Sequence, residues 1–298
     1  MRNGLCLAGA LLLLLAGTAA SAANDQTFDR QVPAQLRGVV EISNVSGNIE
    51  VSGWDRSEVS VHAEHAGGSE GVEMSSEGGH TAIKVRQPAS YGRGQARLQV
   101  KIPKDSELNV SAVSADVTTS GVLGVQRLSA ISGKITAEIA GAEVELKTVS
   151  GSVQVKGHGQ PARLRASTVS GDVHLEHGGG DIEAGTVNGS LIASLDGARS
   201  VRAHTTSGEV RVEGTLARGA TVEASSVSGN LTVRASADGG FAYEVSSFSG
   251  HISDCFNKNP ERVSEYGPGS RLSGTRGEGA GHVRLKTMSG NVELCDRR

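Results

Sequence analysis

Aromatic side chains are scarce in this chain, with eight Phe, Trp and Tyr among 298 residues. A compact globular core depends on such large side chains, whereas stacked β-strands can be filled by Val, Ile, Leu and Ala. Gly, Ser, Thr and Val dominate instead, which favours strands and turns over helices. The aromatics Trp54, Tyr91, Tyr243 and Tyr266 are scattered. They give little support to a carbohydrate-binding groove, which relies on rows of exposed aromatic rings.

Basic residues are not in excess either. The chain has 29 Lys and Arg against 32 Asp and Glu, and its formal net charge is −3. A nucleic-acid-binding protein needs a clustered basic face, so we expect no nucleic-acid partner. After residue 22 no apolar run approaches the ~20 residues that a membrane-spanning helix requires. The mature chain is therefore expected not to span a membrane.

Residues 1–22 have the pattern of a secretory signal peptide. Arg2 gives a positive start, Leu11 to Leu15 form an apolar run, and Ala20-Ser21-Ala22 is a small-residue cleavage site. Cys6 precedes the leucine run, so it is not placed for lipid attachment at the cleavage site. Export is therefore predicted, to the periplasm by preference, with the cell surface and secretion as alternatives.

A five-residue phrase recurs through the chain: an apolar residue, Ser, Gly, a polar residue and an apolar residue. It reads Val-Ser-Gly-Ser-Val around Gly151 and Val-Ser-Gly-Asp-Val around Gly171. Successive copies are 18 to 21 residues apart, and the last gap is 40 residues, or two intervals. Such a fixed period indicates one supersecondary unit stacked on copies of itself. With the central residue of each copy as position 0, the first copy is centred on Ala115. The later copies predict a ladder of structural turns at Ser132, Gly133, Ser150, Gly151, Ser170, Gly171, Asn188, Gly189, Ser207, Gly208, Ser228, Gly229, Ser249, Gly250, Ser289 and Gly290.

Apolar residues recur at fixed positions of each copy. Position +2 is apolar without exception, position −2 nearly so, and position −5 is apolar as well. Alternation with a period of two predicts strands with one face inward, so all three positions are expected to face a core. The odd step from −5 to −2 predicts a bend or bulge near positions −4 and −3. The resulting fold class is all-β, a parallel β-solenoid or β-helix with rungs of 18–21 residues.

Two further columns indicate that identical positions stack on one another. Position −1 is Ser in every copy except Asn188, and small polar side chains there can bond along the stack or to the backbone of the next turn. Stacking at ~4.8 Å places each charge of an alternating column between two opposite charges, which favours this register over slipped ones. Position −6 forms such a column over six copies: Arg127, Glu145, Arg165, Glu183, Arg202 and Glu223.

The chain after residue 22 has two cysteines at equivalent positions. Cys255 and Cys295 each lie five residues after a central glycine, Gly250 and Gly290. Neighbouring rungs would bring their Cα atoms to roughly 5 Å, within reach of a disulfide. Because export allows such a bond to form, we predict a Cys255–Cys295 disulfide that fastens the last rung.

The sequence divides into three segments. Residues 1–22 are the signal peptide, residues 23–105 a β-rich section that caps one end, and residues 106–298 the solenoid repeats. The cap section already contains the phrase at Val45-Ser-Gly-Asn-Ile49, and its strand pairing is left open, with antiparallel pairing as one option. The Gly- and charge-rich segment at about 257–281 is expected to project as a loop.

Histidine pairs raise the question of a metal site. His62 and His65 are three residues apart, as are His174 and His177. On a strand, residues three apart point to opposite faces and cannot close around one ion. We therefore expect solvated surface histidines, no metal and no cofactor.

Carboxylates and serines raise the question of catalysis. Asp116 and Asp172 share position +1 but lie three rungs apart, roughly 14 Å, which is too far for a catalytic pair. The repeated serines lack a base within reach, and the glycine clusters lack a phosphate-binding pattern. No catalytic residue is therefore predicted.

Several stretches resemble a known family. Residues 48–59 (Asn-Ile-Glu-Val-Ser-Gly-Trp-Asp-Arg-Ser-Glu-Val), the repeated Val-Ser-Gly phrases and residues 281–294 are similar to the putative-adhesin family of exported β-strand-repeat proteins of the bacterial envelope. The resemblance covers essentially the whole mature chain. It implies a β-solenoid in the cell envelope, with a role in adhesion or envelope-stress sensing. The family is a domain of unknown function, so it carries over no catalytic residues, and a shared fold does not establish an activity.

Together these features predict a non-enzymatic, exported envelope protein whose solenoid presents an extended surface for binding or adhesion. The expected partner is a protein or an envelope component, bound by the solenoid face or by the segment 257–281. Two alternatives remain: an accessory or sensor protein of an envelope-stress system, and a β-helical enzyme acting on polysaccharide.

Overall fold

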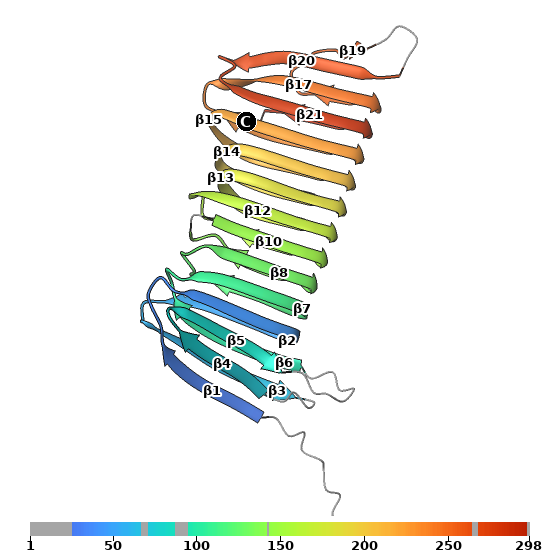
Figure 1. The fold of residues 1–298 in the computed structure, drawn as a ribbon. Helices are drawn as coiled ribbons and strands as arrows, with labels where there is room; N and C mark the ends of the chain where they lie inside the picture. The colour runs from blue at the N-terminus through green and yellow to red at the C-terminus, as the bar shows by residue number, and fades with distance from the viewer. Residues whose placement is uncertain (1–25, 67–70, 87–94, 142, 264–267, 297–298) are drawn as a thin grey trace, which may run out of the picture.

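The computed structural model describes residues 26–66, 71–86, 95–141, 143–263 and 268–296, so the predicted signal peptide lies outside it. The described residues form one sheet of 22 strands, most of them stacked in parallel along a single axis (Figure 1). The all-β fold of stacked parallel rungs is thus confirmed. The first strands are β1 (Gln26–Pro33), β2 (Val39–Trp54), β3 (Glu58–Ala66), β4 (Gly71–Glu77), β5 (His80–Arg86), β6 (Gln95–Pro103), β7 (Glu107–Ser120), β8 (Gln126–Ser132), β9 (Ile135–Glu138), β10 (Glu143–Ser150) and β11 (Val153–Lys156). They are followed by β12 (Pro161–Ser170), β13 (Val173–Asn188), β14 (Leu191–Ser207), β15 (Val210–Ser228), β16 (Leu231–Ala237), β17 (Gly240–Ser249), β18 (Ile252–Asp254), β19 (Glu261–Arg262), β20 (Ser270–Gly277), β21 (Gly281–Ser289) and β22 (Val292–Cys295).

Successive rungs pair at identical repeat positions. Ile135 of β9 pairs with Val117 of β7 and with Val153 of β11, all at position +2. On the other side of the turn, Leu146 of β10 pairs with Leu128 of β8, both at position −5. Parallel pairing in register turns each repeat position into a column along the stack.

The columns at +2 and −5 fill the core, whereas the column at −2 does not. Side chains at +2 and −5 are at most 2% exposed, but those at −2 lie on the surface. The prediction that −2 faces the core is therefore wrong, and so is the predicted bend at −4 and −3. The strands run straight through these positions: β10 ends at Ser150 and β12 at Ser170, both at position −1, and the chain turns at the central glycine. Regular alternation from −5 buries −3 and turns −2 outward.

The central position has no room for a side chain. A Cβ added to Gly229 would lie 2.8 Å from the carbonyl carbon of Gly208 and deep inside van der Waals contact with its oxygen. A Cβ on Gly208 would meet the carbonyl of Gly189 in the same way. The backbone of the neighbouring rung fills this space, so the repeat uses glycine here.

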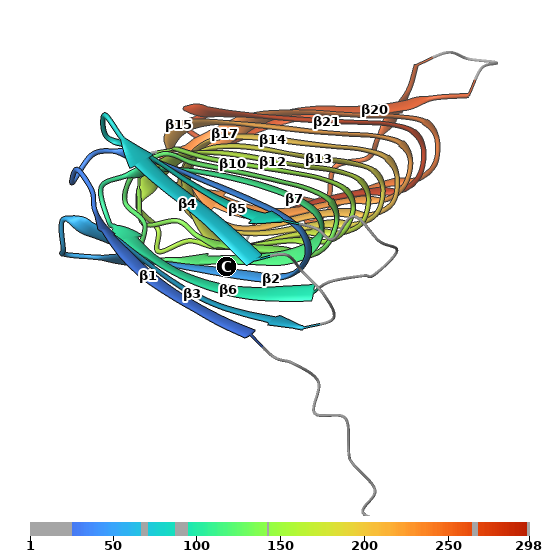
Figure 2. The same cartoon turned by 60° about the horizontal axis from the view of Figure 1, so that its bottom comes forward.

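The amino-terminal section extends the parallel stack before closing it. β2 is itself a rung, with Gly47 paired to Ala115 of β7. β5 and β6 pair in parallel with the two halves of β2 on its other side. Antiparallel strands follow, β4 on β5, β3 on β6 and β1 on β3 (Figure 2). Gly47 and Ala115 are thus neighbours in space but far apart in sequence, because strands β3 to β6 come between them in the chain. These four strands cover the edge of the stack.

The last rung in the sequence is not the last in space. β21 pairs in parallel with β15 on one side and β17 on the other, and β22 lies likewise between β16 and β18. The central glycines therefore follow one another as Gly229, Gly290 and Gly250. β20 then pairs antiparallel with β17 over eight residues, at the top of Figure 1.

The segment 257–281 is therefore not simply a projecting loop, as the sequence predicted. Its residues Ser270–Gly277 form β20, and Glu261–Arg262 form β19, which pairs antiparallel with β20. Because β21 lies between β15 and β17, β17 is the last rung of the stack, and its outer edge needs a partner. An uncovered strand edge invites aggregation. The segment serves as the cap of this end.

The charge column at −6 favours the observed position of the last rung, between the rungs of Gly229 and Gly250. In spatial order the column continues as Glu223, Arg284 and Glu244, so the signs keep alternating. Arg284 lies 3.3 Å from Glu244, and lower in the stack Arg165 lies 3.2 Å from Glu183. Stacking in sequence order would have placed Glu223 beside Glu244, and like charges directly opposite are destabilising. The column thus distinguishes the observed order from the sequential one.

Replacing Arg284 with glutamate tests this role of the column. The change places three acids in a row, and we expect the free energy of unfolding to fall by about 1 kcal/mol at low salt. Because the side chains are exposed, high salt should remove much of the effect. Urea denaturation at two salt concentrations measures it, with Arg284→Gln as the matched uncharged control. Equal stability of R284E and R284Q at low salt would contradict an electrostatic role.

Candidate binding surface

The side chains at position −2 form a line on the outside of the turn. It follows the ends of strands such as β8, β10 and β12, whose arrowheads lie along one edge of the stack in Figure 1. Nine of the side chains are apolar and 40–56% exposed, and the tenth, Thr206, is exposed too. We call this line the bend stripe: in spatial order Val45, Val113, Ile131, Val149, Val169, Val187, Thr206, Val227, Met288 and Phe248.

The bend stripe is large for an exposed apolar feature. Its ten rungs are separated by nine strand spacings of ~4.8 Å, which gives a length of about 43 Å. Half-exposed aliphatic side chains present about 45 Å² each, so the nine apolar side chains of the stripe expose about 400 Å² of apolar surface. The largest contiguous apolar patch of a typical soluble monomer is about 300–600 Å² and is often functional. The stripe is therefore the strongest candidate binding surface of the described residues.

Buried hydroxyl groups at position −3 hold the turn beneath the stripe. The Thr168 hydroxyl donates to the carbonyl of Gly151 at 3.0 Å, and the Thr186 hydroxyl donates to the carbonyl of Gly171 at 3.0 Å. Thr205, Ser247 and Thr287 make the same contact with the neighbouring rung. Sequence analysis missed this column, although its signal was present as Thr or Ser at one position of seven successive copies.

The predicted turn ladder lies directly beside the stripe. Its serines at position −1 are exposed, as is Asn188. Within the described residues, no −1 side chain bonds to the backbone of a neighbouring rung, whereas five of the −3 hydroxyls do; the −3 hydroxyls of Thr148 and Ser226 have no hydrogen-bond partner. Its glycines are the positions of close approach between rungs. The two columns give the stripe an uncharged border.

The carboxylates considered for catalysis bond to backbone amides. Asp116 accepts a hydrogen bond from the Lys134 amide at 2.7 Å, and Asp172 from the Ser190 amide at 2.8 Å. Asn230 accepts from the Asn291 amide at the same repeat position. These side chains join one turn to the next, which is a structural use of position +1.

Four histidines of the described residues, His62, His80, His158 and His174, lie beside carboxylates. His62 Nδ1 lies 2.6 Å from Asp29 and Nε2 lies 3.7 Å from Glu64, and His174 lies 3.4 Å from Glu176. The only group of three side chains within the described residues whose potential ligand atoms lie close enough for one metal ion contains no histidine. It consists of Cys255, Glu293 and Cys295.

The pKa of His62 is raised above its ordinary value, chiefly by its hydrogen bond with Asp29. This pair joins β3 to β1. A raised pKa in the folded state means that the contact stabilises β1 fully below pH ~6.5 and loses this effect as the pH rises through the folded-state pKa. An NMR titration of His62 should give a pKa above 6.5, and Asp29→Asn should lower it. An unchanged pKa in D29N would contradict the pairing.

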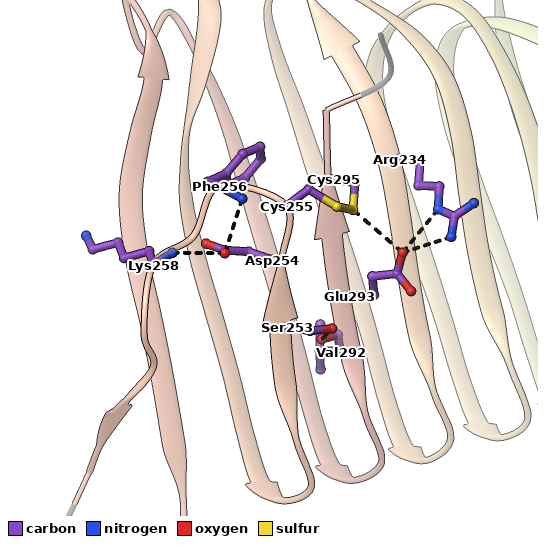
Figure 3. Close-up of a disulfide and its surroundings, with 9 residues drawn as sticks. All are labelled: Arg234, Ser253, Asp254, Cys255, Phe256, Lys258, Val292, Glu293 and Cys295. Carbon is purple, nitrogen blue, oxygen red and sulfur yellow. Dashed lines mark hydrogen bonds and ion pairs between the residues drawn. A yellow bond between two sulfur atoms is a disulfide. The ribbon is translucent and has the colours of Figure 1, made fainter.

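A disulfide joins Cys255 and Cys295, whose Cα atoms are 4.9 Å apart. The two residues meet because β22 lies beside β18 (Figure 3). Glu293 lies 3.6 Å from the Cys295 sulfur and accepts a hydrogen bond from Arg234 at 2.9 Å. Zinc sites bind thiolates, and sulfurs joined to one another do not supply them. The cluster is a structural crosslink.

Aromatic rings gather at the carboxyl-terminal end of the core. The ring centroids of Phe241, Tyr243 and Phe256 are 5.5–6.5 Å apart, and Phe241 is fully buried. Burial is the main cause that raises the pKa of Tyr243. Tyr91 and Tyr266 lie outside the described residues. The three rings plug the end of the stack, an arrangement unlike an exposed row for carbohydrate.

No helix long and apolar enough to cross a membrane occurs in the part of the chain that the structure describes.

None of the curated proteins matches the chain. Solved structures do. A putative adhesin from Parabacteroides merdae is 12% identical, with 91% of this chain and 98% of that one covered and a TM-score of 0.48. A structure named a putative lipid binding protein, from Parabacteroides distasonis, is 10% identical, with 91% and 98% covered and a TM-score of 0.44. A putative adhesin from Bacteroides fragilis is 11% identical, with 90% and 96% covered and a TM-score of 0.35.

The family model described as Toastrack DUF4097 matches residues 37–295. This range runs from the loop before β2 to the last residue of β22 and so includes every rung of the stack. The chain belongs to the Toastrack DUF4097 family.

Proposed function

We propose that this chain is a non-enzymatic, exported protein of the cell envelope that binds its partner through the bend stripe. The observation that carries the proposal is the line of nine apolar side chains, each 40–56% exposed, along ten stacked rungs. A soluble chain keeps so much apolar surface in one line at a cost in solubility, which argues for a function in binding. Adhesion within the envelope is the form of binding that we propose.

The carboxylates support a non-enzymatic role. General acid–base catalysis by two carboxyl groups requires them within ~9 Å across a bond to be cleaved. Asp116 and Asp172 bond instead to the backbone of the next rung, and Glu183 pairs with Arg165 at position −6. Turnover of an envelope polysaccharide that Asp172→Asn abolishes would overturn this part of the proposal.

Export is supported by the disulfide and by residues 1–22. Disulfides persist in oxidising compartments and are rare in the cytosol. Residues 1–22 have a positive start, an apolar run and a small-residue cleavage site at Ala20-Ser21-Ala22, the pattern of a secretory signal peptide. We propose the periplasm as the compartment.

A pull-down from an envelope extract tests the stripe. The variant Val149→Ser/Val169→Ser/Val187→Ser removes three adjacent apolar side chains at the middle of the stripe. The matched control Leu36→Ser/Leu123→Ser/Ile192→Ser removes three apolar side chains that are 39–52% exposed but lie elsewhere. We expect the stripe variant to lose at least about tenfold in captured material, and the control to match wild type. Equal capture by the two variants would overturn the stripe as the binding surface.

The alternative of an envelope-stress accessory places recognition in the segment 257–281. Much of the described part of this segment is the cap strand β20. Its deletion would expose the edge of β17, so loss of a partner after deletion would not separate recognition from stability. The stripe is therefore the better-supported surface.

A further inference from the structure

We infer that the partner of the bend stripe is a second copy of this chain, bound stripe to stripe with the two stacks side by side and parallel. The inference rests on the proposed function of the stripe and names its partner.

The regular spacing of side chains along the stripe favours a second copy of this chain as the partner. Its side chains recur at the strand spacing of ~4.8 Å over nine intervals, a pitch set by backbone hydrogen bonds. An α-helix repeats every ~5.4 Å and drifts out of step along such a line. A second copy carries the same pitch by construction, so every level of one stripe meets a level of the other. Matching at every level is what packs apolar side chains without voids.

The one hydroxyl in the stripe selects the orientation, because the charges on either side of the stripe do not. Position −4 carries Lys147 and Lys286 and no acid, whereas position +1 carries Asp116, Asp172 and Glu209 with Lys134 as its only lysine or arginine. A two-fold axis along the stack puts the +1 column of each copy opposite the −4 column of the other, but at equal levels Asp116 meets Ser111, Asp172 meets Ser167 and Glu209 meets His204, so no acid faces a lysine. The same axis pairs Thr206 with Thr206, whereas antiparallel stacks would put Thr206 opposite Val149 and leave the hydroxyl against an apolar side chain.

Two of these charges already form ion pairs within the chain, and Asp116 and Asp172 accept hydrogen bonds from backbone amides. Lys147 pairs with Glu145, and Glu209 pairs with Arg211 at 2.7 Å. The −4 and +1 columns together hold three lysines and three acids, so their charges balance. Such balance gives no attraction to an anionic lipid surface, which favours a protein partner over a membrane.

The area is adequate for a dimer. About 400 Å² of apolar surface on each copy, at the usual apolar share of an interface, corresponds to about 700 Å² per copy. Stable interfaces bury about 800 Å² per partner. Each apolar side chain of the stripe would meet its own counterpart, and Thr206, the one hydroxyl in the line, would meet Thr206.

Sedimentation of the purified protein over a concentration series tests the inference. We expect a monomer–dimer equilibrium that Val149→Ser/Val169→Ser/Val187→Ser weakens by about a hundredfold. The Leu36→Ser/Leu123→Ser/Ile192→Ser control should dimerise like wild type, and circular dichroism should show that both variants are folded. A wild type that stays monomeric overturns the inference, and so does a dimer that the stripe variant leaves unchanged.

Cross-linking tests the orientation without disturbing the stripe's middle. In the parallel dimer Val113→Cys meets itself, so a short thiol-reactive linker should join two copies. In an antiparallel dimer Val113 would lie opposite Met288, near the other end of the stripe, and V113C would not link. Ile192→Cys, at the exposed position +3 and outside the stripe, is the control that should not link in either case. Failure of V113C to link overturns the parallel arrangement. A monomeric wild type that still captures envelope material through the stripe overturns the second copy as partner and leaves the proposed function standing.

Discussion

Replacing Gly229 with alanine is expected to lower the free energy of unfolding by about 3–5 kcal/mol. The backbone at Gly229 has no unusual conformation, so an alanine meets no strain of its own. The obstacle is space: the added methyl would lie 2.8 Å from the carbonyl carbon of Gly208 and 2.9 Å from the Ser226 hydroxyl, with the Gly208 oxygen closer still. Rungs 208 and 229 must separate to admit it, and the hydrogen bond from the Gly208 amide to the Ser228 carbonyl, now 3.2 Å, would lengthen. Urea denaturation followed by circular dichroism measures the loss.

Ser228→Ala is the matched control. It adds no atom, lies one residue away on the exposed border of the bend stripe, and should change stability by less than about 0.5 kcal/mol. If G229A is as stable as S228A, neighbouring rungs can move apart at no cost, and close backbone approach is not the reason for glycine at this position.

Sequence reasoning predicted the columns of the fold well and the turn poorly. The 18–21-residue period of the repeat shows which residues stack on one another. The invariably apolar +2 column identifies one line of buried side chains. The odd step from −5 to −2 shows that the alternation of buried and exposed side chains breaks somewhere between positions −5 and +2, but it does not show where. A break at −4 and −3, as the sequence predicts, would turn the apolar −2 side chains toward the core. The structure places it at the glycine, where the rungs approach closely, and an apolar residue such as Ile131 is thereby exposed. An apolar column serves equally as core or as binding surface, and periodicity alone does not separate the two.

The order of the last rungs was readable in principle. The alternating column stops at Glu223 if the rungs are taken in sequence, because Glu244 comes next. It continues if Arg284 is inserted before Glu244, as in the structure. The predicted disulfide requires only that the rungs of Cys255 and Cys295 be neighbours, and both orders satisfy this. Charge complementarity thus carried information that the cysteines did not.

The exposure of the bend stripe could not be predicted without the structure. Its members were identified in the sequence as a column, but their exposure depends on which side of each strand faces outward, and that depends on the position of the turn. The −3 hydroxyls explain why the turn is held there: a buried hydroxyl such as Thr186 needs an acceptor, and the Gly171 carbonyl supplies one at 3.0 Å. The same geometry that satisfies the buried hydroxyl turns the next residue, Val187, to solvent.

Removing the disulfide by Cys255→Ala/Cys295→Ala is expected to lower the free energy of unfolding by about 4 kcal/mol. The bond closes a loop of 40 residues, and a loop of this length restricts the unfolded chain by about that amount. The loop includes β20 and β21, so the crosslink keeps the inserted rung between its neighbours. Hydrogen exchange should speed up first in β17, β20 and β21, while β8 to β12 keep their protection, because each rung of a stack depends mainly on its neighbours.

Reductant supplies the control for this prediction. It should destabilise the wild type by about as much as the double substitution does, and it should leave C255A/C295A unchanged, since no other cysteine follows residue 6. A double variant within about 1 kcal/mol of wild type would contradict the role of the bond, because the entropy of a closed loop of this size does not vanish unless the unfolded chain is already compact. In that case the alternating charges of Glu223, Arg284 and Glu244 and the parallel pairing on both sides of β21 would alone suffice to hold the last rung inside the stack.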